Sequence, residues 1–202
     1  MKERLGQVRE KHRMSRVAKR HKKKIKEAGA LILKDDLKAR QRTLRKLEYV
    51  DLEGVVQRKG QVACCISSAD EIVTTELIFN GLLNTLSVEQ AVALLSCLVA
   101  TEKLSKDHNQ KAKVRSDMQR PLQQLQDIIR KVAVVAKDCK MDIDVEDFVE
   151  GFSTQLMDVA YAWVTGAKFS EVIQINKQMF EGSLVRFMRR LDELLRQLSD
   201  AA

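Results

Sequence analysis

The sequence predicts an all-α protein: a bundle of about seven helices with a short β-hairpin-like entry segment and a basic helical arm at the N-terminus. Aromatic residues make up only 4% of the chain and Pro121 is the single proline, which is typical of helical proteins rather than of sandwiches or barrels. Apolar residues also recur in alternating steps of three and four, the spacing of one helix face. A chain of 202 residues is long enough for one domain and an appendage.

The N-terminal quarter carries the positive charge. Residues 1–47 hold 18 Lys/Arg against 5 Asp/Glu, whereas residues 48–202 hold 18 against 23. Residues 1–33 have only a weak apolar stripe, so a helix there would need a partner or stay partly disordered. This run could bind phosphate backbones, act as a nuclear import signal, or be a solvated charged helix. We divide the chain into a basic arm, 1–50, and a helical bundle, 51–202.

The entry to the bundle has a helix followed by a strand-like piece. Asp35 is a good N-cap for a second helix, which ends before Gly54. Residues 55–66 are rich in valine and contain Gly60 as a possible turn residue, which predicts a small hairpin that leans on the helices.

Capping signals delimit the next helices. Residues 68–71 fit a capping box that opens a helix ending at Phe79, and residues 87–90 fit a second one. The helix that follows, 88–99, is apolar nearly all round and should be the buried centre of the bundle. Pro121 suits the first position of a long helix. The seam of that helix consists of Leu122, Leu125, Ile129, Val132, Ala136 and Cys139.

Three shorter patterns lead to the final helix. Asp144 caps a short helix through Glu150, a further helix over 156–163 ends at Gly166, and a short one covers 170–176.

The final helix, 180–198, has two faces, and Ser183 is its expected N-cap. Its apolar seam consists of Phe180, Leu184, Phe187, Leu191, Leu194 and Leu198. A polar stripe, a quarter to a third of a turn away, consists of Arg186, Arg190, Glu193 and Gln197. On this pattern alone the arginines are either solvated or in contact with a partner.

The residues present argue against several kinds of chemistry. The four cysteines form no C-x-x-C pair and lie far from the three histidines in sequence, so neither a zinc site nor a disulfide framework is indicated. The eight glycines form no phosphate-binding loop or dinucleotide-binding turn, and no nucleophile and base can be paired.

The longest apolar run, 91–100, is too short for a bilayer, and the charged N-terminus is unlike a signal peptide. We expect a cytosolic or nuclear protein without catalysis by this chain alone.

Several short sequence motifs in the bundle resemble those of a known protein family. In the first half they are KGQVAC at 59–64, SSADE at 67–71, TELIFNG at 75–81 and QAVALLSC at 90–97. In the second half they are LMDVAYAW at 156–163, TGAKF at 165–169 and the final helix. These motifs resemble the DSHCT domain, the C-terminal helical domain of superkiller-type DExH-box RNA helicases, which deliver RNA to the exosome. FNG at 79–81 and FEGS at 180–183 look closer to the nuclear, polyadenylation-linked branch of the family than to the cytoplasmic one.

The resemblance implies specific roles. In such helicases this domain closes the RNA channel below the motor domains, and its ratchet-type helices face single-stranded bases. By motif, Arg186 and Arg190 would face RNA, with Glu102 as a partner at the channel. For Glu102 an ordinary exposed acid at a helix end remains open. The segment LKARQRTLRKL at 37–47 resembles the returning arm of the stalk that carries the family's arch insertion.

The departures from the family limit what it implies. No motor domain is present, so ATP and Mg²⁺ would bind elsewhere in the helicase, and the chain itself is expected to bind no cofactor. The chain looks cut at both ends. Cys65 and Gln61 stand where the family commonly has glutamate and arginine, which puts a polar contact at the hairpin in doubt.

Expected partners are single-stranded RNA, the motor domains, and the exosome and polyadenylation complex. The alternatives are a non-catalytic protein-interaction module and a truncated gene fragment.

Overall fold

The computed structural model describes residues 2–100, 114–176 and 179–201, and within these ranges every regular element is helical. The elements are α1 (Lys2–Lys46), α2 (Arg58–Cys64), α3 (Glu71–Phe79), the 3₁₀ turn η1 (Leu82–Thr85), α4 (Val88–Val99), α5 (Ser116–Asp138), α6 (Val145–Glu150), α7 (Met157–Val164), α8 (Phe169–Ile175) and α9 (Glu181–Ala201). The predicted all-α class is therefore confirmed.

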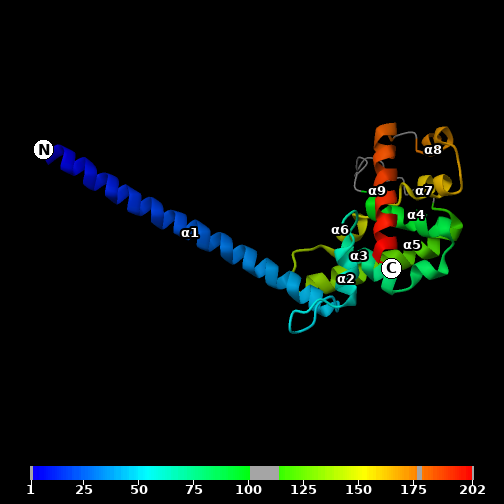
Figure 1. The fold of residues 1–202 in the computed structure, drawn as a ribbon, viewed down its shortest axis with the longest axis horizontal. Coiled ribbons are helices and arrows are strands. Elements are labelled where there is room, and N and C mark those ends of the chain that lie inside the picture. The colour runs from blue at the N-terminus through cyan, green and yellow to red at the C-terminus, as the bar shows by residue number, and fades with distance from the viewer. Residues whose placement is uncertain (1, 101–113, 177–178, 202) are drawn as a thin grey trace.

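The arm is one continuous helix, α1, which extends away from the bundle (Figure 1). The predicted break at Asp35 is wrong, because the helix runs through it. An aspartate favours a cap but does not end a helix when neither glycine nor proline is near. Here Asp36 also forms an i,i+4 pair with Arg40, with 3.1 Å between Oδ2 and Nε, which supports the helix across this point.

The predicted hairpin at 55–66 is wrong. Most of this segment forms α2, and the described residues contain only an isolated antiparallel bridge between Val50 and Val56. Gly60 is buried inside α2 rather than in a turn, and an added Cβ there would lie 2.5 Å from the carbonyl oxygen of Tyr49. Close packing on the Tyr49 backbone, which is not visible in the local pattern, therefore selects the helix.

Local side-chain hydrogen bonds set the beginnings of three bundle helices. The capping box predicted at 68–71 is wrong, because Asp70 rather than Ser68 caps α3. Asp70 accepts a hydrogen bond from the backbone N–H of Val73 at 2.8 Å, and the Ser68 hydroxyl donates to Gln197 instead. Ser87 and Gln90 form the predicted reciprocal capping box of α4.

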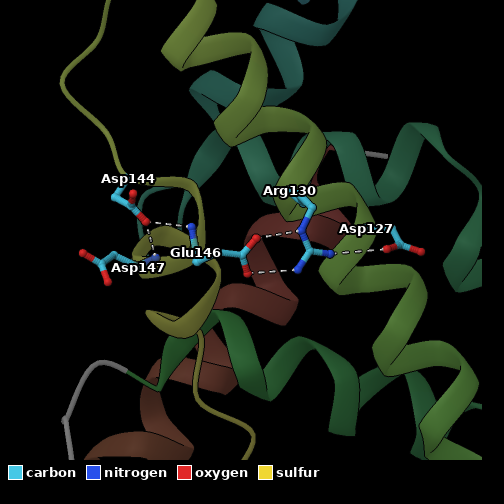
Figure 2. A network of polar contacts seen from close by, with 5 residues as sticks. All are labelled: Asp127, Arg130, Asp144, Glu146 and Asp147. Atoms are coloured by element: carbon cyan, nitrogen blue, oxygen red, sulfur yellow. Dashed lines mark hydrogen bonds and ion pairs between the residues drawn. The ribbon is translucent and has the colours of Figure 1, made fainter.

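The third cap, Asp144, begins α6 and belongs to the polar network of Figure 2. Its Oδ1 accepts from the backbone N–H groups of Glu146 and Asp147, and the bond from Asp147 contributes most to lowering the pKa of Asp144. Arg130 on α5 then donates two hydrogen bonds of 3.2 Å to the Glu146 carboxylate, with Asp127 3.7 Å away on its other side. This bidentate pair holds α6 on α5.

Helix α5 begins at Ser116, five residues before the predicted start at Pro121. Proline removes one backbone donor, but both Met118 and Pro121 are buried, so packing offsets that loss. The predicted seam is otherwise confirmed. Its buried members are Leu125, Ile129, Val132, Ala136 and Cys139, and Leu122 is partly buried.

Helix α4 is the centre of the core, as its composition predicts. Eight consecutive residues, 92–99, are buried, and α4 packs against α5, α7 and α9.

Burial raises the pKa of the Cys97 thiol in this helix to about 12. Cys139 is buried as well, Cys64 and Cys65 are exposed, and all four cysteines are free thiols. In the described ranges no helix is long and apolar enough to cross a membrane.

Candidate nucleic-acid interface

Helix α9 lies on the bundle with its apolar seam against α4. Leu184, Phe187, Leu191 and Leu194 are buried, and Leu198 is partly buried. Phe180 is not part of the seam, because it precedes the helix and its side chain is 85% exposed. The seam fixes the rotation of α9 and therefore the direction in which its polar stripe faces.

Arg186 and Arg190 lie at a cavity where α9 passes the C-terminal end of α4. The cavity is small and partly open to solvent. Its other lining residues are Val99, Ala100, Leu156, Met179, Ser183 and Phe187. The two arginines thus face a mostly apolar depression, and both are exposed residues.

Ser183 orients one of these arginines. The predicted N-cap role of Ser183 is wrong, because its backbone N–H and that of Leu184 both bond to the carbonyl of Phe180, which lies before the helix. The buried Ser183 hydroxyl instead accepts a 2.9 Å hydrogen bond from Nη2 of Arg186. This contact holds one guanidinium along the wall of the cavity.

Gln197 ties the other end of the polar stripe to the loop before α3. Its Oε1 accepts from the backbone N–H groups of Ser67 and Ser68 at 2.9 and 3.1 Å. Its Nε2 donates to the Ser67 hydroxyl at 3.1 Å and to Glu193 at 3.0 Å. Periodicity places Gln197 on the stripe, but nothing in the local sequence reveals partners 130 residues away.

A second depression adjoins the first at Ala100, which lines both. It lies between the loop before α3, the end of α4 and the turn after α6, with Ser68, Asp70, Cys97 and Phe152 among its lining residues. Burial is the main cause of the raised pKa of Asp70, partly opposed by the hydrogen bond from the Val73 N–H. Residues of α9 line only the first depression, and the link between α9 and the second is the bonding of Gln197 to Ser67 and Ser68.

The other charged residues considered in the sequence, Glu102, Arg189 and Arg196, are not among the described residues that line this cavity. Glu102, the third residue expected to face RNA, lies outside the described residues. Arg189 and Arg196 are exposed on other sides of α9, and Arg196 pairs with Asp192 at 3.0 Å. The structure thus brings Arg186 and Arg190 together at one cavity and separates them from the other two arginines of the helix.

Comparison with known proteins gives a consistent family. Residues 53–202 match the DSHCT (NUC185) domain. The chain is 48% identical to the DExH-box ATP-dependent RNA helicase DExH9 of Arabidopsis thaliana over 181 residues, 90% of this chain and 18% of that protein. It is 45% identical to the human exosome RNA helicase MTR4, over 90% of this chain and 17% of that protein.

A more distant relative is the human superkiller complex protein 2, which is 33% identical over 86% of this chain and 13% of its own length. The chain therefore spans less than a fifth of the length of these curated relatives. The family resemblance inferred from the sequence motifs is confirmed, and the chain belongs to the DSHCT domain family of DExH-box RNA helicases.

Proposed function

We propose that this chain is the RNA-channel domain of an ATP-dependent RNA helicase that acts in exosome-linked RNA processing and decay, and that Arg186 and Arg190 contact single-stranded RNA. The observation that carries the proposal is their joint position at the cavity beside the end of α4. Guanidinium groups bind phosphates through a planar fork and stack on bases, so two of them beside an apolar depression suit an unpaired strand. Ser183 would restrict the orientation of Arg186 before RNA binds.

Catalysis would reside in the motor domains of the complete helicase. The chain has no glycine-rich phosphate-binding motif, so ATP and Mg²⁺ would bind to those domains. The names of relatives such as the exosome RNA helicase MTR4 support the exosome as a partner. We extend this proposal to a polyadenylation complex and to the nucleus, with the cytoplasm as the alternative location.

Charge reversal on α9 tests the proposed contact. The variant R186E/R190E should bind a single-stranded oligoribonucleotide about tenfold or more weakly than the unaltered chain. Each phosphate contact to a single strand contributes about 0.7 to the slope of log affinity against log salt, so this slope should also fall by about 1 to 1.5. Fluorescence anisotropy at several salt concentrations measures both quantities.

The matched control is R189E/R196E, which has the same net charge and lies on the same helix. It should retain most of the affinity, because its altered side chains lie away from the cavity. Equal losses in the two variants would mean that only the overall charge matters, and that the cavity is not the contact site. Circular dichroism checks that both variants fold.

A second candidate function is that of a protein-interaction module, which an exposed apolar patch on α7 and α8 favours. Trp163 and Phe169 make an edge-to-face contact with ring centroids 6.4 Å apart, and their side chains remain 45% and 38% exposed. Ile175 is also 46% exposed. Binding to a protein partner that is insensitive to salt, with no RNA binding, would favour this function.

A further inference from the structure

We propose that one face of α1 is a second RNA-binding surface, which holds the sugar–phosphate backbone without reading its sequence. The basic face, as we name it, consists of Arg16, Lys19, Arg20, Lys23 and Lys26. The inference does not depend on Arg186 and Arg190, which belong to the other end of the chain. It rests on the density of charge, its arrangement around the helix and its exposure.

The charge density of this part of α1 is high. Residues 11–26 contain nine cations, six lysines and three arginines, and no Asp or Glu. At a rise of about 1.5 Å per residue these sixteen residues cover roughly 23 Å of helix, or about one positive charge per 2.5 Å. A nucleic-acid duplex has one phosphate per about 1.7 Å of its axis. The two charge densities are of the same order and opposite in sign.

The cations are also arranged on one side. At 3.6 residues per turn, the five members of the basic face lie within an arc of about 120°. Met14, Val17 and Ile25 lie on the opposite side, where their side chains are 64%, 49% and 72% exposed. The other four cations flank the basic face. From residue 16 to residue 26 this arc of α1 therefore carries only cations.

The bundle does not cover or neutralise this surface. Every residue from 10 to 29 is exposed, and α1 meets the bundle only near its C-terminal end (Figure 1). Two of the nine cations form ion pairs with flanking acids: Arg13 with Glu10 at 2.7 Å and Lys23 with Glu27 at 3.6 Å. Both pairs are exposed, and such pairs are weak, so phosphate groups could displace them.

The residue types point to the backbone of RNA rather than to its bases. Residues 1–47 contain no Phe, Tyr or Trp, and proteins that hold unpaired bases rely on such side chains for stacking. Lysine and arginine contacts to phosphates need no unpaired base, and each contact releases more counterions from a duplex, about 0.9, than from a single strand, about 0.7. The basic face should therefore bind double-stranded RNA, which distinguishes it from the cavity on α9.

A blunt RNA duplex of about 20 base pairs is the probe that separates the two surfaces, because it offers no unpaired strand to α9. The variant R16Q/K19Q/R20Q of the full chain should bind it about tenfold or more weakly. The salt slope should fall by about 2 to 3, since each phosphate contact to a duplex contributes about 0.9. Glutamine has a helix propensity close to that of lysine and arginine, so α1 should stay helical.

Three further variants make the result decisive. R120Q/K131Q/K137Q removes three charges from the exposed surface of α5 and should stay within about twofold of the unaltered chain. R16K/R20K keeps the charge of the basic face and should bind almost normally. R186E/R190E should retain its duplex binding, so failure of the α9 proposal would not imitate failure of this one.

The proposal is overturned if the unaltered chain does not bind the duplex, or if R16Q/K19Q/R20Q binds it as tightly as the unaltered chain. It is equally overturned if the α5 control loses as much affinity as the α1 variant.

Discussion

Asp70 caps α3 from a partly buried position, and the cap and the burial have opposite effects on its pKa. Its carboxylate caps α3 through the Val73 N–H, and it also lines the second depression beside α4. Burial penalises the charged form and raises the pKa of this group above its ordinary value of about 3.9. The folded state therefore binds a proton at Asp70 more tightly than the unfolded state does.

The sign of this shift predicts how stability depends on pH. A raised pKa stabilises the folded state below the unfolded-state pKa, and that contribution is lost as pH rises through the folded-state pKa. The variant Asp70→Asn keeps a good capping group but does not titrate. The free energy of unfolding of Asp70→Asn, relative to that of the unaltered chain, should increase as pH rises through the window that starts near 4.

Urea unfolding of both proteins from about pH 3 to pH 7 measures this difference. All other acids are common to the two proteins, so the comparison isolates Asp70. A difference that is constant across this range, or that decreases as pH rises, would contradict the shift.

Among the helices, α2 shows most clearly where local sequence fails to determine structure. The valines of 55–62 favour a strand by propensity, yet Gly60 packs against the backbone of Tyr49, and Lys59 on the same helix pairs with Glu76 at 2.8 Å. These partners lie eleven and seventeen residues away. Tertiary contacts of this kind override β propensity.

A pair of glycine variants tests this explanation. Gly60→Ala would place a Cβ 2.5 Å from the Tyr49 carbonyl oxygen and 2.6 Å from Val56 Cγ1. It should destabilise the protein by about 1 to 3 kcal/mol, the usual cost of overpacking. Gly182→Ala in α9 has no atom within 4 Å of the new Cβ and should be neutral or stabilising by up to about 1 kcal/mol. Urea unfolding compares the two, and equal stability would show that α2 is not held by this contact.

The helix ends explain which predictions succeeded. The starts of α4 and α6 were predicted correctly because Ser87 and Asp144 bond to backbone groups within three residues, whereas α3 starts at Glu71 and is capped by Asp70 rather than by Ser68. Asp35 and Pro121 misled because each permits a helix start without requiring one. In α5 the burial of Met118 decides the earlier start.

The candidate site was predictable only in part, for the same reason. Periodicity alone placed Arg186 and Arg190 on one stripe of α9, because that relation is local. The cavity depends on Val99 and Leu156, and the orientation of the stripe depends on the bonds of Gln197 to the loop at Ser67. A single amino-acid sequence has no local pattern that reveals contacts between residues so far apart.

At the scale of the whole molecule, the arm and the bundle meet at a small contact. Ala39 and Thr43 are buried, the Thr43 hydroxyl lies 3.4 Å from Met141 Sδ, and Lys46 pairs with Asp138 at 2.9 Å. This contact joins the end of α1 to the region where α5 ends. The two proposed RNA surfaces, one on α1 and one on α9, are thus carried by opposite ends of the chain (Figure 1).

The division of charge supports this arrangement. Residues 1–47 have 13 more basic than acidic residues, whereas residues 48–202 have five more acidic than basic ones. RNA attraction by the bundle would therefore depend on locally placed arginines, while attraction by the arm would depend on summed charge. A measurement that reports single side chains can separate these contributions.

The most direct test of the central claim follows the side-chain Nε–H signals of the arginines by NMR while a single-stranded oligoribonucleotide is added. The account predicts saturable shifts of the Arg186 and Arg190 signals, with those of Arg189 and Arg196 nearly unchanged. Shifts confined to Arg13, Arg16 and Arg20 on α1, with the four α9 signals unmoved, would contradict the claim that α9 contacts single-stranded RNA.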